Sequence, residues 1–239
     1  MTLDLRSGEV RGRDGAAACI ERRPMTLAVP TSVFLIRHAA YDHRPSPEGT
    51  EAASDFGLSE LGHAQVRALC DRLARSGEIQ ADALYSSTLP RARETAAFVS
   101  KVLGLEPESV AELCEWESGN EILGAEAFMK RFYELDPAER RMHRFAPGFE
   151  TLADFTRRVH GKLEELVERH EDETIVLVVH GGVVEAAFHF FLGFGPGPFE
   201  GGYPAVGNTS ITLWRKSGRR QGWVQEFAND THHLRSIGT

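Results

Sequence analysis

Two short runs of apolar residues constrain the fold of this chain most. Residues 32–36 read Ser-Val-Phe-Leu-Ile and residues 174–179 read Thr-Ile-Val-Leu-Val-Val, so neither run alternates between apolar and polar side chains. A strand with one face in water alternates in this way, whereas a strand that is buried on both faces is apolar throughout. Both runs are therefore predicted to be strands of a sheet that is covered on both sides.

Segments with helical spacing of apolar residues separate these strands. One begins at Ser59, a suitable N-cap, and ends at Gly77, a second spans residues 90–104, and a third spans residues 151–170. Further strands are predicted at 83–86, 210–214 and 223–227, with a further helix at 183–192. Strands and helices that alternate along a chain form parallel sheets with helices on the faces. We therefore expect an α/β fold, a three-layer α/β/α sandwich with an open, mostly parallel sheet.

Length and charge limit the organisation and the partners of the chain. With 239 residues, it can bury one large core but hardly two, so we expect residues 31–239 to form a single catalytic domain. Residues 1–30 mix charges, glycines and small side chains without an apolar period, which indicates a disordered or loosely attached tail. The net charge of −8 argues against a surface for nucleic acid or anionic membranes. An anionic substrate must therefore meet a locally basic pocket.

The cysteines and the apolar segments bear on the location of the protein. Cys19, Cys70 and Cys114 are an odd number without CxxC spacing, so they indicate neither a disulfide framework nor a thiolate zinc site. Residues 16–20 are too short and too weakly apolar for a signal-peptide core, and no stretch approaches the length of a membrane span. These features predict a cytoplasmic protein without a membrane partner, and they leave open whether it forms a homodimer.

Histidines follow the ends of both apolar strands. His38 comes after the first strand and His180 after the second, at the strand ends where parallel sheets carry their functional sites. A neutral imidazole is a competent nucleophile near pH 7, and neighbouring guanidinium groups keep it unprotonated. Arg37 and Arg91 are the candidates for such groups, because a planar guanidinium can hold phosphoryl oxygens bidentately. Taken alone, Arg91 is better explained as a solvent-exposed residue in the first turn of a helix.

The order of several motifs adds a family resemblance. Arg37-His38-Ala39 resembles the Arg-His-Gly signature of the histidine phosphatase superfamily, also called the phosphoglycerate mutase-like family. The segments that are similar to other motifs of this family, in the family's order, are 58–65, 87–96, 113–119, 178–182 and 208–211. The resemblance covers roughly residues 33–214. It implies the α/β/α fold and phosphoryl transfer without a metal or other cofactor.

The resemblance also implies roles for individual residues. His38 would attack phosphorus and become a phosphohistidine, and Arg37, Arg91 and His180 would bind the phosphoryl oxygens. The backbone of Gly181, at a helix N-terminus, would add a further donor to the anion.

A carboxyl group completes the implied mechanism. Glu115 would protonate the leaving oxygen and then activate water, with Glu117 as the alternative general acid.

The sequence departs from the family pattern at three positions after the strand. Ala39 replaces the glycine of the signature, which is an exchange between small residues, and Ala40 replaces the usual polar residue. Arg44 stands where many relatives place an asparagine that contacts phosphate. A loop arginine is the favoured interpretation of Arg44, and an additional phosphate ligand is the alternative.

The chain has ten histidines, so a metal site has to be considered. Glu185 and His189 share a helix face, and His232 is adjacent to His233, but neither set brings the further ligand that a zinc site requires. No metal is therefore predicted.

Three functions are consistent with the sequence. The favoured one is hydrolysis of a phosphomonoester of a small phosphorylated metabolite, and the alternatives are a phosphoglycerate mutase and a catalytically silent module that binds phosphorylated ligands. True mutases resemble Glu-Arg-x-Tyr-Gly at the acid and carry a long insertion before the second histidine. Here residues 116–119 read Trp-Glu-Ser-Gly, and two ordinary helical segments, with a break at Pro137 and a turn at Pro147, fill the span to His180. Without the long insertion of the mutases, the active-site pocket is expected to be less enclosed. Such a pocket admits water, which favours hydrolysis.

Overall fold

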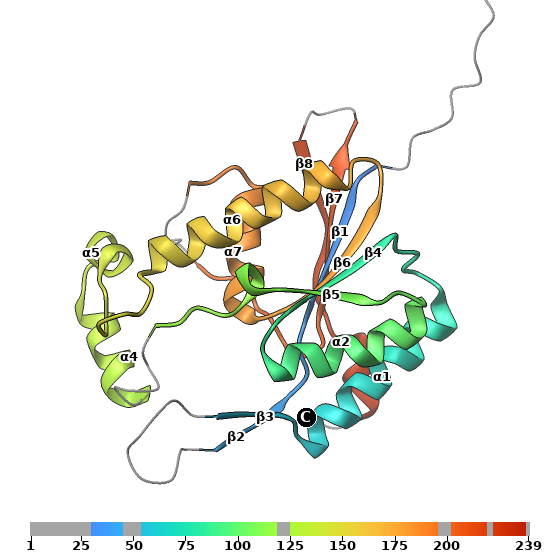
Figure 1. The fold of residues 1–239 in the computed structure, drawn as a ribbon, viewed down its shortest axis with the longest axis horizontal. Coiled ribbons are helices and arrows are strands. Elements are labelled where there is room, and N and C mark those ends of the chain that lie inside the picture. The colour runs from blue at the N-terminus through green and yellow to red at the C-terminus, as the bar shows by residue number, and fades with distance from the viewer. Residues whose placement is uncertain (1–29, 45–53, 119–124, 196–201, 219–221, 238–239) are drawn as a thin grey trace, which may run out of the picture.

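The computed structural model describes the chain in five parts, residues 30–44, 54–118, 125–195, 202–218 and 222–237. Within them, six strands form one sheet in the order β5-β4-β6-β1-β7-β8 (Figure 1). Their bounds are β1 Ser32–Arg37, β4 Ala83–Ser87, β5 Pro107–Val110, β6 Thr174–Val179, β7 Ile211–Ser217 and β8 Gly222–Asp230. The first four strands along this order are parallel, β7 pairs antiparallel with β1, and β8 pairs antiparallel with β7. The sheet is therefore mostly parallel, as predicted.

Helices cover both faces of the sheet. The helices of the described residues are α1 Glu60–Ser76, α2 Pro90–Leu103, α4 Ala125–Glu134, α5 Pro137–Met142, α6 Leu152–Arg169 and α7 Gly181–Phe191. Helices α1 and α2 lie on one face and α6 and α7 on the other (Figure 1). Helices α4 and α5 stand apart from the sheet, next to the beginning of α6 (Figure 1). The predicted three-layer sandwich is thus confirmed.

The burial of β1 explains its uninterrupted apolar sequence. Val33 and Leu35 pack in the core beneath α6 and α7, and Phe34 and Ile36 pack in the core beneath α1 and α2. Alternate side chains of a strand point to opposite faces, so a strand between two helical layers needs apolar residues at every position.

Local signals set most helix ends where the sequence predicts them. Ser59 caps α1 by accepting a hydrogen bond from the Gly62 amide at 3.1 Å, and Gly77 ends this helix in the left-handed conformation with φ of 59°. Thr151 starts α6 through a capping box with Asp154.

Three strands were not predicted. A separate antiparallel ribbon joins β2 (Tyr41–Arg44) to β3 (Ser54–Leu58), and β5 is a four-residue edge strand with exposed residues at its centre. None of them carries an apolar run or a clear alternation. The predicted tail lies outside the described residues apart from Pro30. The single domain over residues 31–239 stays a prediction.

Candidate active site

The two histidines meet because their strands are neighbours. Strands β1 and β6 are parallel and pair Arg37 with Val179, so the next residues, His38 and His180, leave the sheet at the same edge. Their ring centroids lie 5.0 Å apart. Both side chains are buried, with His38 3% exposed and His180 fully enclosed. The structure therefore brings together the two histidines that the sequence analysis singled out.

The hydrogen bonds of His38 assign its tautomer. Nδ1 lies 2.8 Å from the carbonyl oxygen of Ala39, and a carbonyl can only accept, so Nδ1 carries the proton. Nε2 then keeps a lone pair, and Arg91 Nε donates to it at 3.2 Å. This arrangement leaves Nε2 as the nitrogen with nucleophilic character.

Arg91 lies over an aromatic ring that the sequence analysis missed. Its guanidinium carbon lies 4.6 Å from the ring centroid of Tyr41, and the edge of this ring also contacts His38 with centroids 5.6 Å apart. Stacking on an aromatic face restricts the guanidinium plane. The first turn of α2 thus directs Arg91 toward His38, contrary to the alternative of a solvent-exposed side chain. Tyr41 belongs to the unpredicted ribbon, and no motif pointed to it.

Arg37 offers a buried donor to the same space. Its Nη1 donates to the carbonyl of Val206 at 2.6 Å, and its Nε is buried without a partner among the described residues. Burial lowers the pKa of Arg37 from its ordinary value, while the Glu115 carboxylate opposes this shift. A guanidinium remains protonated under these conditions, so Nε is a charged donor available to an anion.

His180 is held by a serine of the neighbouring strand. Its Nε2 lies 2.7 Å from Ser87 Oγ, and its Nδ1 is buried without a partner among the described residues. Burial holds the pKa of His180 well below its usual range, with Arg91 as the second cause, so the ring is neutral. Ser87 thus fixes the orientation of the ring, and its hydroxyl also donates to Cys114 Sγ at 3.3 Å.

Glu115 reaches the beginning of α7. Its Oε2 accepts from the Gly182 amide at 3.1 Å, and its Oε1 accepts from the Trp116 amide at 3.0 Å. A β-carbon at position 182 would lie 2.3 Å from Oε1. The second glycine of the His-Gly-Gly segment is therefore needed for the approach of this carboxyl group. Gly181, the first residue of α7, lies beside it at the N-terminus of the helix.

Gly182→Ala is expected to lower kcat by about tenfold to a hundredfold, because the added methyl group displaces the Glu115 carboxyl group from its position. The rate of phosphate release and the melting temperature would be measured together. Gly161→Ala is the matched control, since a β-carbon at this position of α6 meets no atom within 4 Å. Activity of Gly182→Ala within about threefold of the parent would show that Glu115 is not held by this contact.

The structure places Glu117 away from Gly182 and does not describe the side chain of Arg44. Glu117 is exposed, and its backbone carbonyl accepts from the Glu150 amide, so Glu115 and not Glu117 lies at Gly182. Arg44 ends β2, and its side chain lies outside the described part of the structure.

Arg158 holds the segment that carries Glu115. Its guanidinium forms two hydrogen bonds of 2.7 Å with the Glu150 carboxylate. It also donates to the carbonyl oxygens of Glu112, at 2.7 Å, and Cys114, at 3.1 Å. This residue was not among the candidates predicted from the sequence. Arg158 follows the buried Phe155 by three residues and therefore borders the apolar face of α6. This spacing is a signal in the sequence, because an arginine beside core positions usually has a partly buried partner.

The other motifs contact the backbone around His38. Asn208 Nδ2 donates to the His38 carbonyl at 2.9 Å, and Thr95 Oγ1 accepts from the Ala39 amide at 3.1 Å. Gln65 Oε1 accepts from the Ala40 amide at 2.8 Å. These contacts hold the turn after β1 in place. Side chains from motifs that lie far apart in the sequence thus bind the backbone of the same three residues, 38–40.

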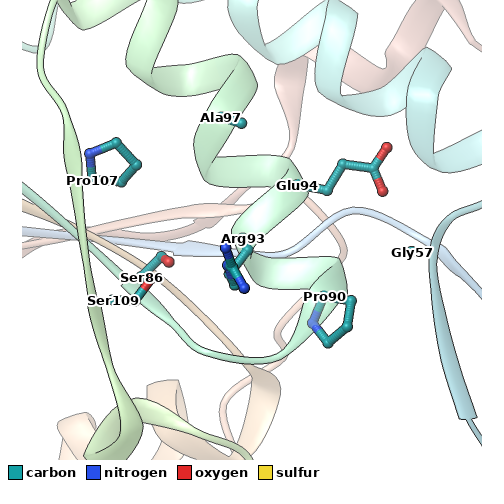
Figure 2. Close-up of a pocket in the computed structure, with 8 residues that line it drawn as sticks. All are labelled: Gly57, Ser86, Pro90, Arg93, Glu94, Ala97, Pro107 and Ser109. Atoms are coloured by element: carbon teal, nitrogen blue, oxygen red, sulfur yellow. The ribbon is translucent and has the colours of Figure 1, made fainter.

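A cavity of about 580 Å³ lies on the other side of the first turns of α2 (Figure 2). Ser86 and Arg93 line it, whereas Ser87 and Arg91 face the histidines. Neighbouring strand residues and helix residues two apart point in opposite directions, so this cavity is distinct from the candidate site.

The described residues contain no group of three or more His, Cys, Asp and Glu side chains placed to hold a metal ion. In this part of the chain, Cys70 and Cys114 are free thiols, and no helix has the length and apolar character to cross a bilayer.

Comparison with known proteins shows the family of this chain. Residues 33–231 match the sequence model of the histidine phosphatase superfamily (branch 1). A metal-independent phosphoserine phosphatase of Arabidopsis thaliana is 28% identical over 87% of this chain and 85% of its own. Among solved structures, a phosphoserine phosphatase mutant of Entamoeba histolytica in complex with phosphoserine has a TM-score of 0.64 at 23% identity, over 85% of this chain and 99% of that one. A mycobacterial glucosyl-3-phosphoglycerate phosphatase with inorganic phosphate has a TM-score of 0.61 at 25% identity, over 84% and 98%. The family match spans most of the chain, and the protein therefore belongs to branch 1 of the histidine phosphatase superfamily.

Proposed function

We propose that this protein is a phosphatase that hydrolyses small phosphomonoesters through a phosphohistidine at His38. The observation that carries the proposal is the orientation of the His38 ring. Its Nδ1 proton is donated to the Ala39 carbonyl, and its Nε2 lone pair faces the cationic side chain of Arg91. A neutral imidazole whose lone pair lies beside a guanidinium is suited to attack a phosphoryl group.

The first half-reaction forms the phosphohistidine. His38 Nε2 attacks phosphorus while the bond from phosphorus to the ester oxygen breaks, and the leaving oxygen takes its proton from the Glu115 carboxyl group. Arg91, the free Nε of Arg37 and His180 bind the phosphoryl oxygens.

The second half-reaction returns the enzyme to its starting state. Water attacks phosphorus, the Glu115 carboxylate takes a proton from this water, and the bond between phosphorus and Nε2 breaks to release inorganic phosphate. The Gly181 amide at the N-terminus of α7 adds a donor for the anion in both steps. The guanidinium groups of Arg37 and Arg91 supply the positive charge that metal ions supply in other phosphatases. The proposed mechanism accordingly uses no metal.

The names of the relatives support a small metabolite as substrate and water as acceptor. They are phosphatases of phosphoserine and of glucosyl-3-phosphoglycerate, and the Arabidopsis relative is described as metal-independent. We place the protein in the cytoplasm because Cys70 and Cys114 are unpaired thiols, which fits a reducing compartment.

The test follows phosphate release and isomerisation in the same assay. A panel of phosphorylated metabolites, including 2-phosphoglycerate and 3-phosphoglycerate, would be supplied with and without 2,3-bisphosphoglycerate, after dialysis against EDTA. We expect inorganic phosphate from at least one ester and no rapid isomerisation. Rapid isomerisation with little phosphate release would identify a mutase instead. Binding of the esters without either reaction would identify a silent module, and activity restored only by one divalent ion would contradict the metal-independent mechanism.

A further inference from the structure

Glu185 lies beside the candidate site on α7. It follows Gly181 by four residues, and residues four apart lie on the same face of a helix. A β-carbon at Gly181 would lie 3.8 Å from Arg37 Nε and 4.0 Å from Glu115 Oε2, so this face borders the site. The charge of the Glu185 carboxylate accordingly interacts with both Glu115 and Arg37.

The protein balances the negative charge of the Glu185 carboxylate only in part. It is half-buried, and no hydrogen bond or ion pair joins it to another described side chain. Burial, followed by repulsion from Glu115, raises the pKa of Glu185 to about 7, although the charge of Arg37 opposes the shift. Partial burial of a carboxylate that lacks a hydrogen-bond partner is unfavourable, so a bound cation would stabilise this group.

The charges around the site are divided into two sides. Arg91 and the free Nε of Arg37 offer positive charge to the phosphoryl group, whereas Glu115 and Glu185 present carboxyl groups at the beginning of α7. The Glu115 oxygens already accept two backbone amides, but those of Glu185 do not. A ligand that carries only a phosphate would leave Glu185 without a hydrogen-bond partner.

We propose that Glu185 determines specificity by accepting a cationic group, a primary ammonium, that the substrate carries close to its phosphate ester. The inference rests on the proposed phosphatase function and narrows its substrates to zwitterionic phosphomonoesters. An ammonium group offers three donors, so it can hydrogen-bond to Glu185 while the phosphate is held by the guanidinium groups. A site built around a buried polar group discriminates against a ligand that cannot pair with it.

The proposal predicts a dependence on pH. The charged groups that face Glu185 from the adjoining elements are Arg37 of β1 and Glu115. On the packed helices, His189 of α7 and His160 of α6 have lowered pKa values, chiefly because of burial, and are neutral above pH 7. The ionisation of Glu185 near pH 7 should therefore control the preference for an ammonium ester, which is expected to rise by about fivefold between about pH 6 and about pH 8.

The experiment compares two esters of nearly equal shape. O-Phosphoethanolamine carries an ammonium group where propyl phosphate carries a methyl group, and the measured quantity is the ratio of their kcat/KM values. We expect the parent to favour the ammonium ester by about tenfold or more, and Glu185→Gln to reduce the ratio to about one at every pH. Glu185→Asp keeps the charge and should retain part of the preference. Glu164→Gln removes a charge at an exposed position of α6 and is the matched control, with the ratio of the parent.

A preference that survives in Glu185→Gln, or a parent that shows no preference, would overturn the proposal. Because the result is a ratio, a general loss of activity in the variant does not imitate the expected outcome. Calorimetric binding of the same two esters gives the comparison without turnover. A protein that binds the ammonium ester through Glu185 but hydrolyses no ester would therefore contradict the phosphatase function and not this inference.

Discussion

His38→Ala is expected to abolish the phosphoenzyme and to lower kcat by about ten-thousandfold or more, because the bond from nitrogen to phosphorus can no longer form. The nearby ring of His180 cannot replace it. Its Nε2 is engaged by Ser87 at 2.7 Å. Rapid quenching with a phosphate-labelled substrate should give an acid-labile, base-stable protein phosphate in the parent and none in the variant.

The control for His38→Ala is His232→Ala, which removes an exposed imidazole near the C-terminus. This variant should give the same yield of phosphoenzyme as the parent. A normal amount of labelled phosphohistidine in His38→Ala would assign the nucleophile to another residue. Circular dichroism of both variants would establish that they are folded.

Arg91→Ala is expected to lower kcat/KM by about a hundredfold or more. A guanidinium about 4 Å from a phosphoryl oxygen, at an effective dielectric constant near 20, interacts by roughly 4 kcal/mol per unit charge pair. Part of this interaction already stabilises the bound substrate and therefore affects KM. Only the part that is gained in the transition state affects kcat. The variant also removes the donor to His38 Nε2 and the contact with the Tyr41 ring.

Two further variants separate the causes of this loss. Arg93→Ala removes a guanidinium from the same turn of α2, but on the side of the other cavity (Figure 2), and should leave kcat/KM within about threefold of the parent. Arg91→Lys keeps the charge without the planar fork, so an intermediate loss is expected. If Arg91→Ala resembled Arg93→Ala, Arg91 would have no part in binding the phosphoryl group.

The sequence determined the features that depend on near neighbours or on the periodicity of side chains. The apolar runs of β1 and β6 predicted strands with two buried faces, because each strand position must match a helical layer. Ser59, Gly77 and Thr151 predicted helix ends, since their hydrogen bonds or backbone angles involve residues within one turn.

The motifs predicted residues of the candidate site that the local signals did not indicate. Their order supported the family, which is confirmed, and they led to His38, His180, Arg91 and Glu115, which the structure brings to one edge of the sheet. Their catalytic roles stay predictions.

Only the tertiary structure decided how these groups are arranged. The lone pair of His38 on Nε2, the approach of Glu115 to Gly182 and the contact of Arg158 with the segment before Glu115 all depend on partners far away in the sequence. Tyr41 lies in a ribbon without an apolar pattern, so its place over Arg91 left no periodic signal. Hydrogen bonds between distant segments depend on the order of the strands and the packing of the helices, and periodicity along one segment does not contain that information.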